Sequence, residues 1–233
     1  MSRVFIVTGA RKGIGRHLAE HYLAQGHIVA GCSRQDSSLT HERYHHYPLD
    51  VADEKAVIAM VRDVARRHGT IDVVLNNAGV AAMNHLLATP LAGVQATFAT
   101  NFVGSFLFLR EAAKVMVRKR SGCIVNFSTV AVPMRLEGEA AYAASKAALV
   151  SLTEIAAREL APFGIRVNAV GPTPVLSDLI RTVPKEKIDG LLARQAIPRL
   201  GELDDVANVV DFFVSERSRF ITGQTLYLGG VVG

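Results

Sequence analysis

Near its start, this chain of 233 residues reads Val4-Phe-Ile-Val-Thr-Gly9-Ala-Arg-Lys-Gly13-Ile-Gly15, and this segment sets its architecture. An apolar strand-like run leads into three closely spaced glycines and then into the helix-like run Ile14–Gln25. Glycines let a backbone turn sharply and approach a pyrophosphate, and the helix N-terminus offers unpaired N–H groups to the anion. The segment predicts a strand–turn–helix unit that binds a dinucleotide. The alternative is an ordinary strand-to-helix turn. The predicted contacts are Gly9, Arg11, Lys12, Gly13, Ile14 and Gly15.

The rest of the chain alternates between strand-like and helix-like runs. This rhythm predicts an α/β fold of a single domain over residues 1–233, with a doubly wound parallel sheet and right-handed crossovers. Strands are expected at Val4–Val7, Ile28–Cys32, Tyr47–Leu49, Asp72–Leu75, Cys123–Phe127, Arg166–Val170 and Thr225–Leu228. Helices are expected at Ile14–Gln25, Glu54–His68, Leu91–Lys119, Ala141–Leu160 and Asp204–Val214.

Composition excludes several classes of protein. Hydrophobic residues make up 49% of the chain, which suits a sheet covered by helices on both faces. Cys32 and Cys123 lie in strand-like runs without disulfide or zinc spacing, so we expect two reduced core thiols and no metal site. The net charge of +5 comes without an arginine-rich arm, so we expect a surface that tolerates anionic ligands and no nucleic-acid partner.

The same chain gives no sign of a membrane partner. It starts directly with a strand, no signal peptide precedes Val4, and no apolar run reaches the roughly 20 residues of a membrane helix. We therefore expect a soluble cytoplasmic protein.

The segment between Arg34 and Asp50 is rich in Ser and His and has no clear apolar period. A fold of this class normally places a helix there. His41, His45 and His46 have neither a helical i,i+4 partner nor a Cys or carboxylate framework, which a zinc site requires. The segment is therefore interpreted as a solvated loop.

Tyr142 and Lys146 stand four residues apart within a helix-favouring run. Positions i and i+4 share one face of an α-helix, so the phenol and the ammonium point into the same space. Chance alone produces such pairs in many helices. Here three other motifs accompany the pair, and together they indicate a proton-donating site beside a nicotinamide pocket.

The order and spacing of these motifs carry a family resemblance. A TGxxxGxG loop from Thr8, Asn76-Asn77-Ala78-Gly79, Asn101 and the YxxxK pair at Tyr142 together resemble the short-chain dehydrogenase/reductase family over nearly the whole chain. The resemblance implies a Rossmann-type sheet of seven strands, a nicotinamide cofactor, and hydride transfer to or from a carbonyl or alcohol.

The resemblance also implies roles for single residues. Tyr142 becomes the general acid, and Lys146 becomes the cation that brings its pKa toward neutral and holds the nicotinamide ribose. Asn101 holds a water that links Lys146 to solvent. The family's usual serine falls at Thr129, whose hydroxyl still donates to a carbonyl oxygen. Ser128 is the rival, although it should point to the other side of an extended segment.

The cofactor is expected to be NADPH. The end of the second strand reads Gly31-Cys-Ser33-Arg34 and lacks the carboxylate that binds the ribose 2′-hydroxyl in NAD-specific relatives. Arg34, with help from Lys12 and Ser33, matches a 2′-phosphate. The alternative is Arg34 as a solvated loop residue. The resemblance adds further cofactor contacts at Asp50, Val51, Asn77, Ala78, Gly79, Tyr142 and Lys146.

The C-terminal part suggests the substrate. The resemblance places Pro172, Val175 and Ser177 against the nicotinamide and a substrate lid within residues 176–195. Ile197–Gly201 and Phe220–Thr225 resemble segments of 3-oxoacyl-(acyl carrier protein) reductases, which implies reduction of a β-ketoacyl thioester. The acidic carrier would dock on basic residues at the pocket mouth, for which the candidates are Arg118, Lys119 and Arg120.

Other outcomes remain open. A second enzyme class reduces a free small ketone, sugar or polyol, and a third possibility is a cofactor-binding sensor without catalysis. The apolar, glycine-poor segment between Thr129 and Tyr142 favours a specialised acyl substrate. The resemblance also implies a homotetramer or homodimer.

Overall fold

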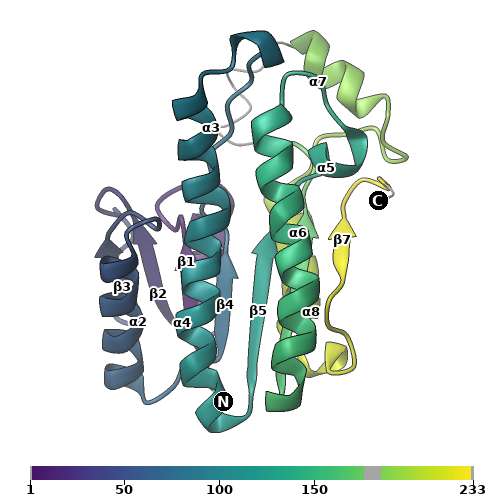
Figure 1. Cartoon of the computed structure of the whole chain (residues 1–233). Coiled ribbons are helices and arrows are strands. Elements are labelled where there is room, and N and C mark those ends of the chain that lie inside the picture. The colour runs from purple at the N-terminus through teal and green to yellow at the C-terminus, as the bar shows by residue number, and fades with distance from the viewer. Residues whose placement is uncertain (1, 176–184, 232–233) are drawn as a thin grey trace.

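The computed structural model describes residues 2–175 and 185–231. It contains a parallel sheet of seven strands in the order β3-β2-β1-β4-β5-β6-β7, which confirms the predicted Rossmann-type fold (Figure 1). The strands are β1 (Val4–Thr8), β2 (Ile28–Ser33), β3 (Tyr44–Pro48), β4 (Val73–Asn76), β5 (Gly122–Phe127), β6 (Ile165–Gly171) and β7 (Thr225–Tyr227).

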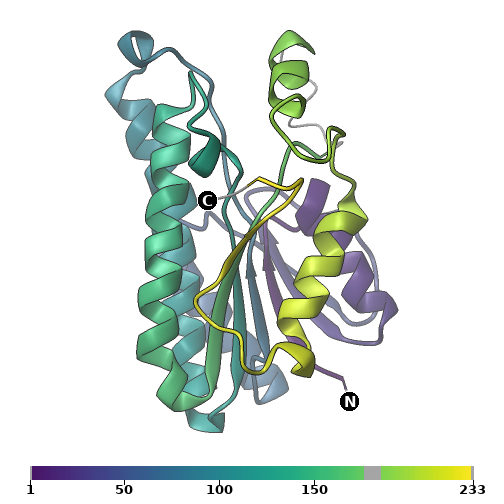
Figure 2. The same ribbon diagram turned by 90° about the vertical axis from the view of Figure 1, so that its right-hand side faces the viewer.

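Helices cover the sheet in two layers, which Figure 2 shows from the side. One layer holds α2, α4 and α6, and the other holds α1 and α8. The α-helices are α1 (Gly13–Ala24), α2 (Glu54–His68), α3 (Leu91–Phe98), α4 (Gly104–Lys119), α5 (Ala131–Met134), α6 (Ala140–Leu160), α7 (Lys185–Leu192) and α8 (Leu203–Val214).

Alternation along each strand explains the two layers, because successive side chains point to opposite faces of a sheet. In β1, Val4 and Ile6 pack in the core under α2, α4 and α6. Phe5 and Val7 pack in the other core, under α1 and α8. Every residue of β1 is buried, as expected for a central strand of a parallel sheet.

The expected helix Leu91–Lys119 is present, but it contains a π-helical turn at Ala99–Val103 between α3 and α4. An 18-residue window of this combined helix has a mean hydropathy of 1.3, so by length and composition alone the helix could cross a membrane. Core helices meet the same criteria, so the expectation that the chain has no membrane helix stays a prediction. The helix packs one face on the sheet, through Leu107, Phe108 and Met116.

The segment between Arg34 and Asp50 differs from its interpretation as a solvated loop. Strand β3 begins at Tyr44 rather than Tyr47, so His45 and His46 lie in an edge strand paired with β2. Backbone pairing, which a side-chain pattern does not report, holds these polar residues in the sheet. Leu49 extends the pairing, since its N–H donates to the Ser33 carbonyl at 2.9 Å.

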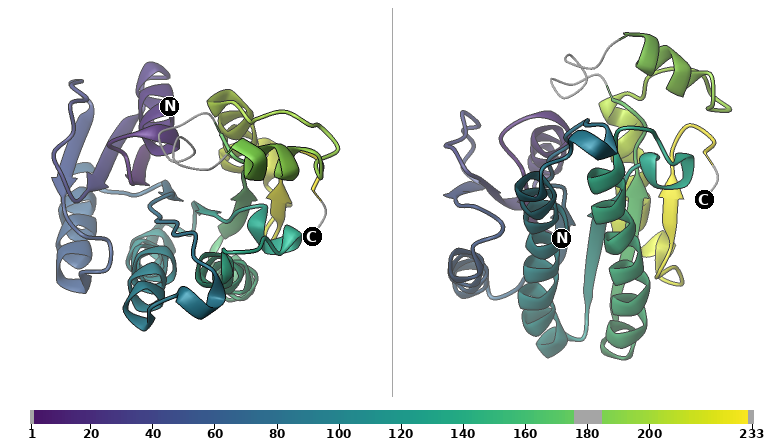
Figure 3. Two further views of the ribbon diagram at one scale, coloured as in Figure 1. Left: turned by 90° about the horizontal axis from the view of Figure 1, so that it is seen from above. Right: turned by 45° about the horizontal axis from the view of Figure 1, so that its top comes forward.

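All strands run in the same direction, so their carboxyl ends lie together along one edge of the sheet, across the ends of the strands. The loops after β1, β2, β4 and β5 meet there, and α7 and the amino end of α3 stand above them (Figure 3). In open parallel sheets, ligands bind outside the carboxyl ends of the strands, so the candidate site is sought at this edge.

Candidate active site

The glycine loop after β1 has the shape of an anion cradle. Gly9 and Gly13 adopt positive φ angles of 69° and 58°, which suit glycine. A Cβ on Gly15 would lie 2.4 Å from the Gly9 carbonyl oxygen, whereas a Cβ on Gly13 would meet open space. Lys12 caps α1 without a side-chain hydrogen bond, so its side chain does not occupy the amides of the first turn. These features fit the pyrophosphate of a dinucleotide.

Side chains after β4 fasten this loop. The Asn77 amide donates to the Thr8 carbonyl at 2.9 Å, and the Thr8 hydroxyl accepts from the Ala78 N–H at 2.9 Å. The Asn77 side chain is thus used to hold the glycine loop. Its predicted place beside the ribose stays a prediction, as do those of Ala78 and Gly79.

Two predicted side chains, those of Asn101 and Lys146, lie close to Gly79. A Cβ at Gly79 would lie 3.3 Å from both Asn101 Oδ1 and Lys146 Nζ. The structure therefore places the ends of β4, the π-turn and α6 around one small space.

Asn101 is fully buried in the π-turn, and its side chain is fully engaged. Its Oδ1 accepts from Val80 N at 2.8 Å, and its Nδ2 donates to Val80 O at 3.0 Å and to Ser145 Oγ at 3.0 Å. The side chain therefore anchors the loop after β4 to α6. The predicted role of Asn101 in a water relay stays a prediction.

Ser145 was not predicted as a site residue. Its hydroxyl accepts from Asn101 and donates to the Tyr142 carbonyl at 2.7 Å, so it links two predicted residues. The sequence offered one signal that could have identified it: Ser145 is a small polar residue between Tyr142 and Lys146 in an otherwise apolar helix.

Tyr142 lies half-buried in the first turn of α6, beside the Thr129 hydroxyl. Burial raises the pKa of Tyr142 to about 12, the Thr129 hydrogen bond lowers it, and the Glu139 carboxylate raises it. The sequence predicted a pKa brought toward neutral by Lys146. Burial is the largest influence on the pKa, and Lys146 is not among the groups that shift it, so the phenol is protonated at neutral pH.

Lys146 is buried on the same face of α6. Its Nζ donates to the Phe127 carbonyl at 2.6 Å, which fixes the ammonium at the end of β5. Burial lowers the pKa of Lys146 to about 8. The amine therefore carries its charge at neutral pH, although the protein interior makes that charge costly.

The hydroxyls of Thr129 and Ser128 point to different sides of the segment after β5. Thr129 Oγ1 accepts from Ala131 N at 3.2 Å and lies beside Tyr142. Ser128 Oγ lies instead beside Tyr227, whose pKa is raised by burial and lowered by this hydroxyl. The geometry supports Thr129 as the substrate-facing hydroxyl, as the strand alternation predicted.

This assignment predicts opposite outcomes for two substitutions. Thr129→Val keeps the side-chain shape and removes the donor, so kcat should fall by about 10- to 100-fold, as for loss of one preorganised donor. Ser128→Ala should leave kcat within about threefold, because its hydroxyl faces Tyr227. Steady-state kinetics on both variants tests this, and a silent Thr129→Val beside an inactive Ser128→Ala would reverse the assignment.

At the end of β2, the backbone joins the glycine loop to the predicted specificity residues. The Gly9 and Ala10 amides donate to the Cys32 carbonyl at 2.9 and 3.1 Å. Ser33 Oγ donates to the Gln35 carbonyl at 2.6 Å. The Arg34 side chain is exposed and forms no ion pair with any residue that the structure describes.

The remaining predicted contacts lie at the same edge. Asp50 Oδ1 accepts from Ala52 N at 2.9 Å, and Val51 is buried against Gly104. The Pro172 carbonyl accepts from Val130 N, and Val175 forms a bridge with Gly201. Ser177 and the first part of the predicted lid, residues 176–184, lie outside the described residues.

The described part of the lid contacts the segment before Tyr142. Arg194 Nη2 donates to the Met134 carbonyl at 2.6 Å, and Lys187 is close enough to the Glu139 carboxylate to oppose the rise in its pKa that burial causes. These contacts place α7 and the residues after it over the site (Figure 3).

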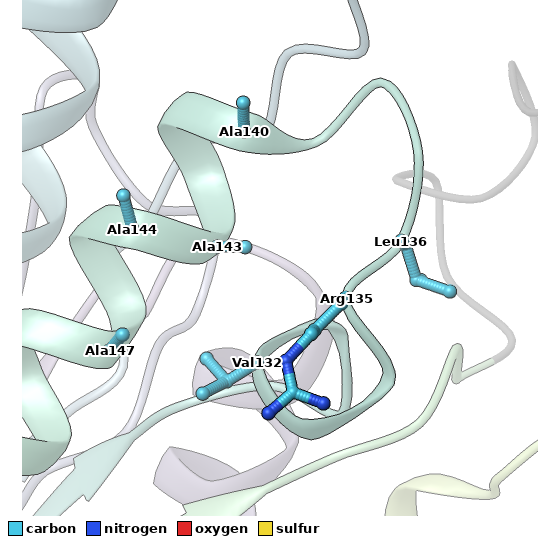
Figure 4. A pocket seen from close by; sticks show the side chains of 7 residues that line it. All are labelled: Val132, Arg135, Leu136, Ala140, Ala143, Ala144 and Ala147. Carbon is cyan, nitrogen blue, oxygen red and sulfur yellow. The ribbon is translucent and has the colours of Figure 1, made fainter.

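A cavity of about 320 Å³ lies between α5 and α6. Figure 4 shows Arg135 at this cavity, with the small side chains of α6 beside it. None of its lining residues belongs to the predicted site, and helical spacing puts them on a different face of α6 from Tyr142 and Lys146. They are Val132, Arg135, Leu136, Ala140, Ala143, Ala144 and Ala147.

Comparisons with known proteins agree with this geometry. A family model described as enoyl-(acyl carrier protein) reductase matches residues 9–231. A 3-oxoacyl-[acyl-carrier-protein] reductase FabG of Staphylococcus aureus is 35% identical over 240 residues, which cover 99% of this chain and 98% of the relative.

Two solved structures are similar over almost the whole chain. The ligand-free aldohexose dehydrogenase of Thermoplasma acidophilum has a TM-score of 0.91 at 31% identity, covering 99% of this chain and 94% of that one. The structure of ElxO with NADP bound also has a TM-score of 0.91, at 29% identity, covering 99% of this chain and 98% of that one. The chain belongs to the short-chain dehydrogenase/reductase family of oxidoreductases, which use a nicotinamide cofactor.

Proposed function

We propose that this protein is an NADPH-dependent ketoreductase that reduces a β-ketoacyl thioester to the β-hydroxyacyl form. The observation that carries the proposal is the Thr129–Tyr142 hydroxyl pair, beside buried Lys146, at the same sheet edge as an anion-binding glycine loop. A positioned acid and a fixed donor are what a carbonyl needs as it becomes an alcohol.

Thr129, Tyr142 and Lys146 have distinct roles in the proposed mechanism. When bound, NADPH supplies the hydride that reaches the carbonyl carbon. Thr129 donates a hydrogen bond to the carbonyl oxygen, and Tyr142 gives that oxygen its proton. Lys146 stabilises the phenolate that remains and binds the nicotinamide ribose. A proton from solvent then restores Tyr142, which leaves the enzyme unchanged.

The raised pKa of Tyr142 suits the direction of reduction. A general acid acts in its protonated form, and a phenol with a pKa of about 12 holds its proton throughout the neutral range. The reverse reaction needs the phenolate, which burial disfavours before the cofactor binds.

Arg34 supports NADPH over NADH, because the end of β2 offers an exposed guanidinium where NAD-specific relatives carry a carboxylate. Arg34→Glu should therefore raise KM for NADPH by about 10- to 100-fold and leave KM for NADH within a few-fold. The measurement is kcat/KM for both cofactors in the wild type and the variant. A wild-type preference for NADH would contradict this choice of cofactor.

The acyl substrate is supported by the name of the Staphylococcus aureus relative and by the apolar segment before Tyr142. In that segment, Val132 and Pro133 enter the short helix α5, and Met134 is buried. We expect kcat/KM for acetoacetyl-pantetheine or acetoacetyl carrier protein to exceed that for free ketones and aldohexoses by at least about tenfold. The opposite order would favour the second candidate.

That second candidate, a reductase of a free sugar or polyol, has one observation in its favour. Glu139 places a half-buried carboxyl three residues before Tyr142, and burial raises its pKa. Carboxyl groups bind sugar hydroxyls well, and one of the similar solved structures is an aldohexose dehydrogenase.

The predicted carrier-docking residues do not lie at the pocket mouth of their own subunit. Arg118 and Lys119 end α4 at the amino edge of the sheet, and Arg120 donates to the Pro162 carbonyl at 2.7 Å. The site lies at the opposite edge, because α4 runs antiparallel to the strands (Figure 1). This part of the sequence-based prediction was wrong within one subunit. In a parallel sheet, the helix that precedes β5 ends beside the amino end of that strand, opposite the carboxyl ends where the site lies.

Exposed apolar side chains on one face support self-association as a dimer or tetramer. The outer faces of the π-turn, α4 and α6 expose Val103, Phe106 and Ile155, which are 39%, 36% and 53% exposed. A second copy that packs on these faces would cover them, and we include this assembly in the proposed function.

A further inference from the structure

We propose that His46, on the edge strand β3, is a positioning residue that makes the site selective for NADPH over NADH. It would act by holding Ser33 and Gln35, the two neighbours of Arg34. This inference rests on the proposed use of NADPH. It assigns a task to a histidine that the sequence pattern placed in a solvated loop.

The contacts of His46 converge on the Ser33–Gln35 turn. Its Nε2 lies 3.0 Å from the Gln35 carbonyl oxygen and 3.1 Å from Ser33 Oγ. A carbonyl oxygen only accepts, so Nε2 carries the proton and donates to it. Nδ1 is then free to accept from the Tyr44 hydroxyl, 2.9 Å away.

Tyr44 gives this imidazole a rigid support. Its side chain is buried under β2, where a Cβ on Gly31 would lie 2.4 Å from the Tyr44 hydroxyl oxygen. The backbone of His46 is paired opposite Gly31 in the sheet ladder. The imidazole is therefore held from its Nδ1 side by the core and presents its Nε2–H toward the turn.

The geometry bears directly on Arg34, which stands between the two residues that His46 contacts. With the Gln35 carbonyl and Ser33 Oγ both fixed, the backbone on either side of Arg34 is held in one arrangement. A long cationic side chain that starts from a fixed backbone loses less freedom when it binds an anion. The exposed guanidinium of Arg34 is thus presented from an ordered turn.

His46 also frees the Ser33 hydroxyl for a ligand. In the structure, the Ser33 hydroxyl donates its hydrogen bond to the Gln35 carbonyl at 2.6 Å. If Ser33 rotates to donate to a phosphate, the Gln35 carbonyl keeps the hydrogen bond from His46. Without His46, Ser33 would be the only protein donor to that exposed carbonyl, so a rotation of Ser33 toward a phosphate would leave the carbonyl to water alone.

The neighbouring His45 provides a matched control. It belongs to the same strand, but its ring stacks on His68 at a centroid distance of 5.5 Å and so faces away from the turn. Substitution of His45 changes the same edge strand without touching Ser33 or Gln35.

The test compares ligands with and without the 2′-phosphate. Calorimetry on the whole protein would measure Kd for NADPH, NADH, 2′,5′-ADP and 5′-AMP in the wild type, His46→Leu, His46→Gln and His45→Leu. We expect His46→Leu to weaken NADPH and 2′,5′-ADP by about tenfold and to leave NADH and 5′-AMP within about twofold. His46→Gln keeps an N–H donor and should recover most of the affinity, and His45→Leu should bind as the wild type does.

A double substitution separates positioning from a general effect on folding. In the Ser33→Ala background, His46→Leu should cost clearly less than tenfold, because part of its effect passes through Ser33. Equal weakening of all four ligands by His46→Leu would show a purely structural role and overturn the inference. If the wild type itself does not distinguish 2′,5′-ADP from 5′-AMP, the proposed cofactor fails first, and the role of His46 falls with it.

Discussion

Replacing Tyr142 with phenylalanine is expected to lower kcat for ketone reduction by about 10²- to 10⁴-fold, the usual contribution of a general acid. The variant keeps the ring and loses only the hydroxyl that lies beside Thr129. Kd for NADPH should change by less than about threefold, since the phenol hydroxyl is not part of the glycine loop. Rapid-mixing kinetics for kcat and fluorescence titration for Kd measure the two quantities.

The matched control for this substitution is Tyr47→Phe. The Tyr47 hydroxyl donates to Asp63 at 2.8 Å. Tyr47 lies in the edge strand β3 and Asp63 in α2, on the opposite side of the sheet from β5 and β6, which α6 connects. Tyr47→Phe should keep wild-type kcat. Turnover by Tyr142→Phe at more than about a tenth of the wild-type rate would mean that another group donates the proton.

Lys146→Met should separate activity from stability. We expect kcat/KM to fall by at least about 100-fold, because the variant loses both the charge beside Tyr142 and the predicted ribose contact. The stability of the folded protein should nevertheless survive, since methionine fills a similar volume without a desolvated ammonium. Steady-state kinetics and denaturant unfolding on the same preparation test both parts.

The burial of Lys146 also predicts how the free energy of unfolding depends on pH. The pKa of Lys146 is about 8 in the folded protein and 10.5 as the ordinary value. Between these values the unfolded state binds more protons at Lys146, so the contribution of Lys146 to the free energy of unfolding rises with pH, by at most about 1.4 kcal/mol per pH unit. The buried thiols and phenols with raised pKa values contribute in the opposite direction in both proteins, so the prediction concerns the difference between wild type and variant. Lys146→Met should lack this rise between about pH 8 and pH 10. Parallel curves for the two proteins in that range would contradict the burial of a charged Lys146.

Much of the fold was predictable because the core is encoded locally. The runs Val4–Val7 and Glu54–His68 carry the strand and helix patterns that the structure contains, and α2 has the predicted bounds. His45 and His46 were misjudged, because an edge strand is held by backbone pairing to β2, and polar side chains there leave no apolar period.

The relative placement of the candidate residues was predictable, whereas their pKa values and backbone conformation were not. Helical spacing placed Tyr142 and Lys146 on one face, and strand alternation separated Thr129 from Ser128. The pKa of Tyr142 could not be inferred, since it depends on how deeply the fold buries the phenol. The π-turn that contains Asn101 was not predicted either, because the sequence from Leu91 to Lys119 reads as one continuous helix.

The most direct test of the proposed reductase is a single turnover of the NADPH-loaded protein with acetoacetyl-pantetheine. The account predicts oxidation of one equivalent of NADPH per site and formation of the β-hydroxyacyl product in the wild type, with almost none of either in Tyr142→Phe. Rapid NADPH oxidation by an aldohexose or small ketone, with none by the thioester, would contradict it.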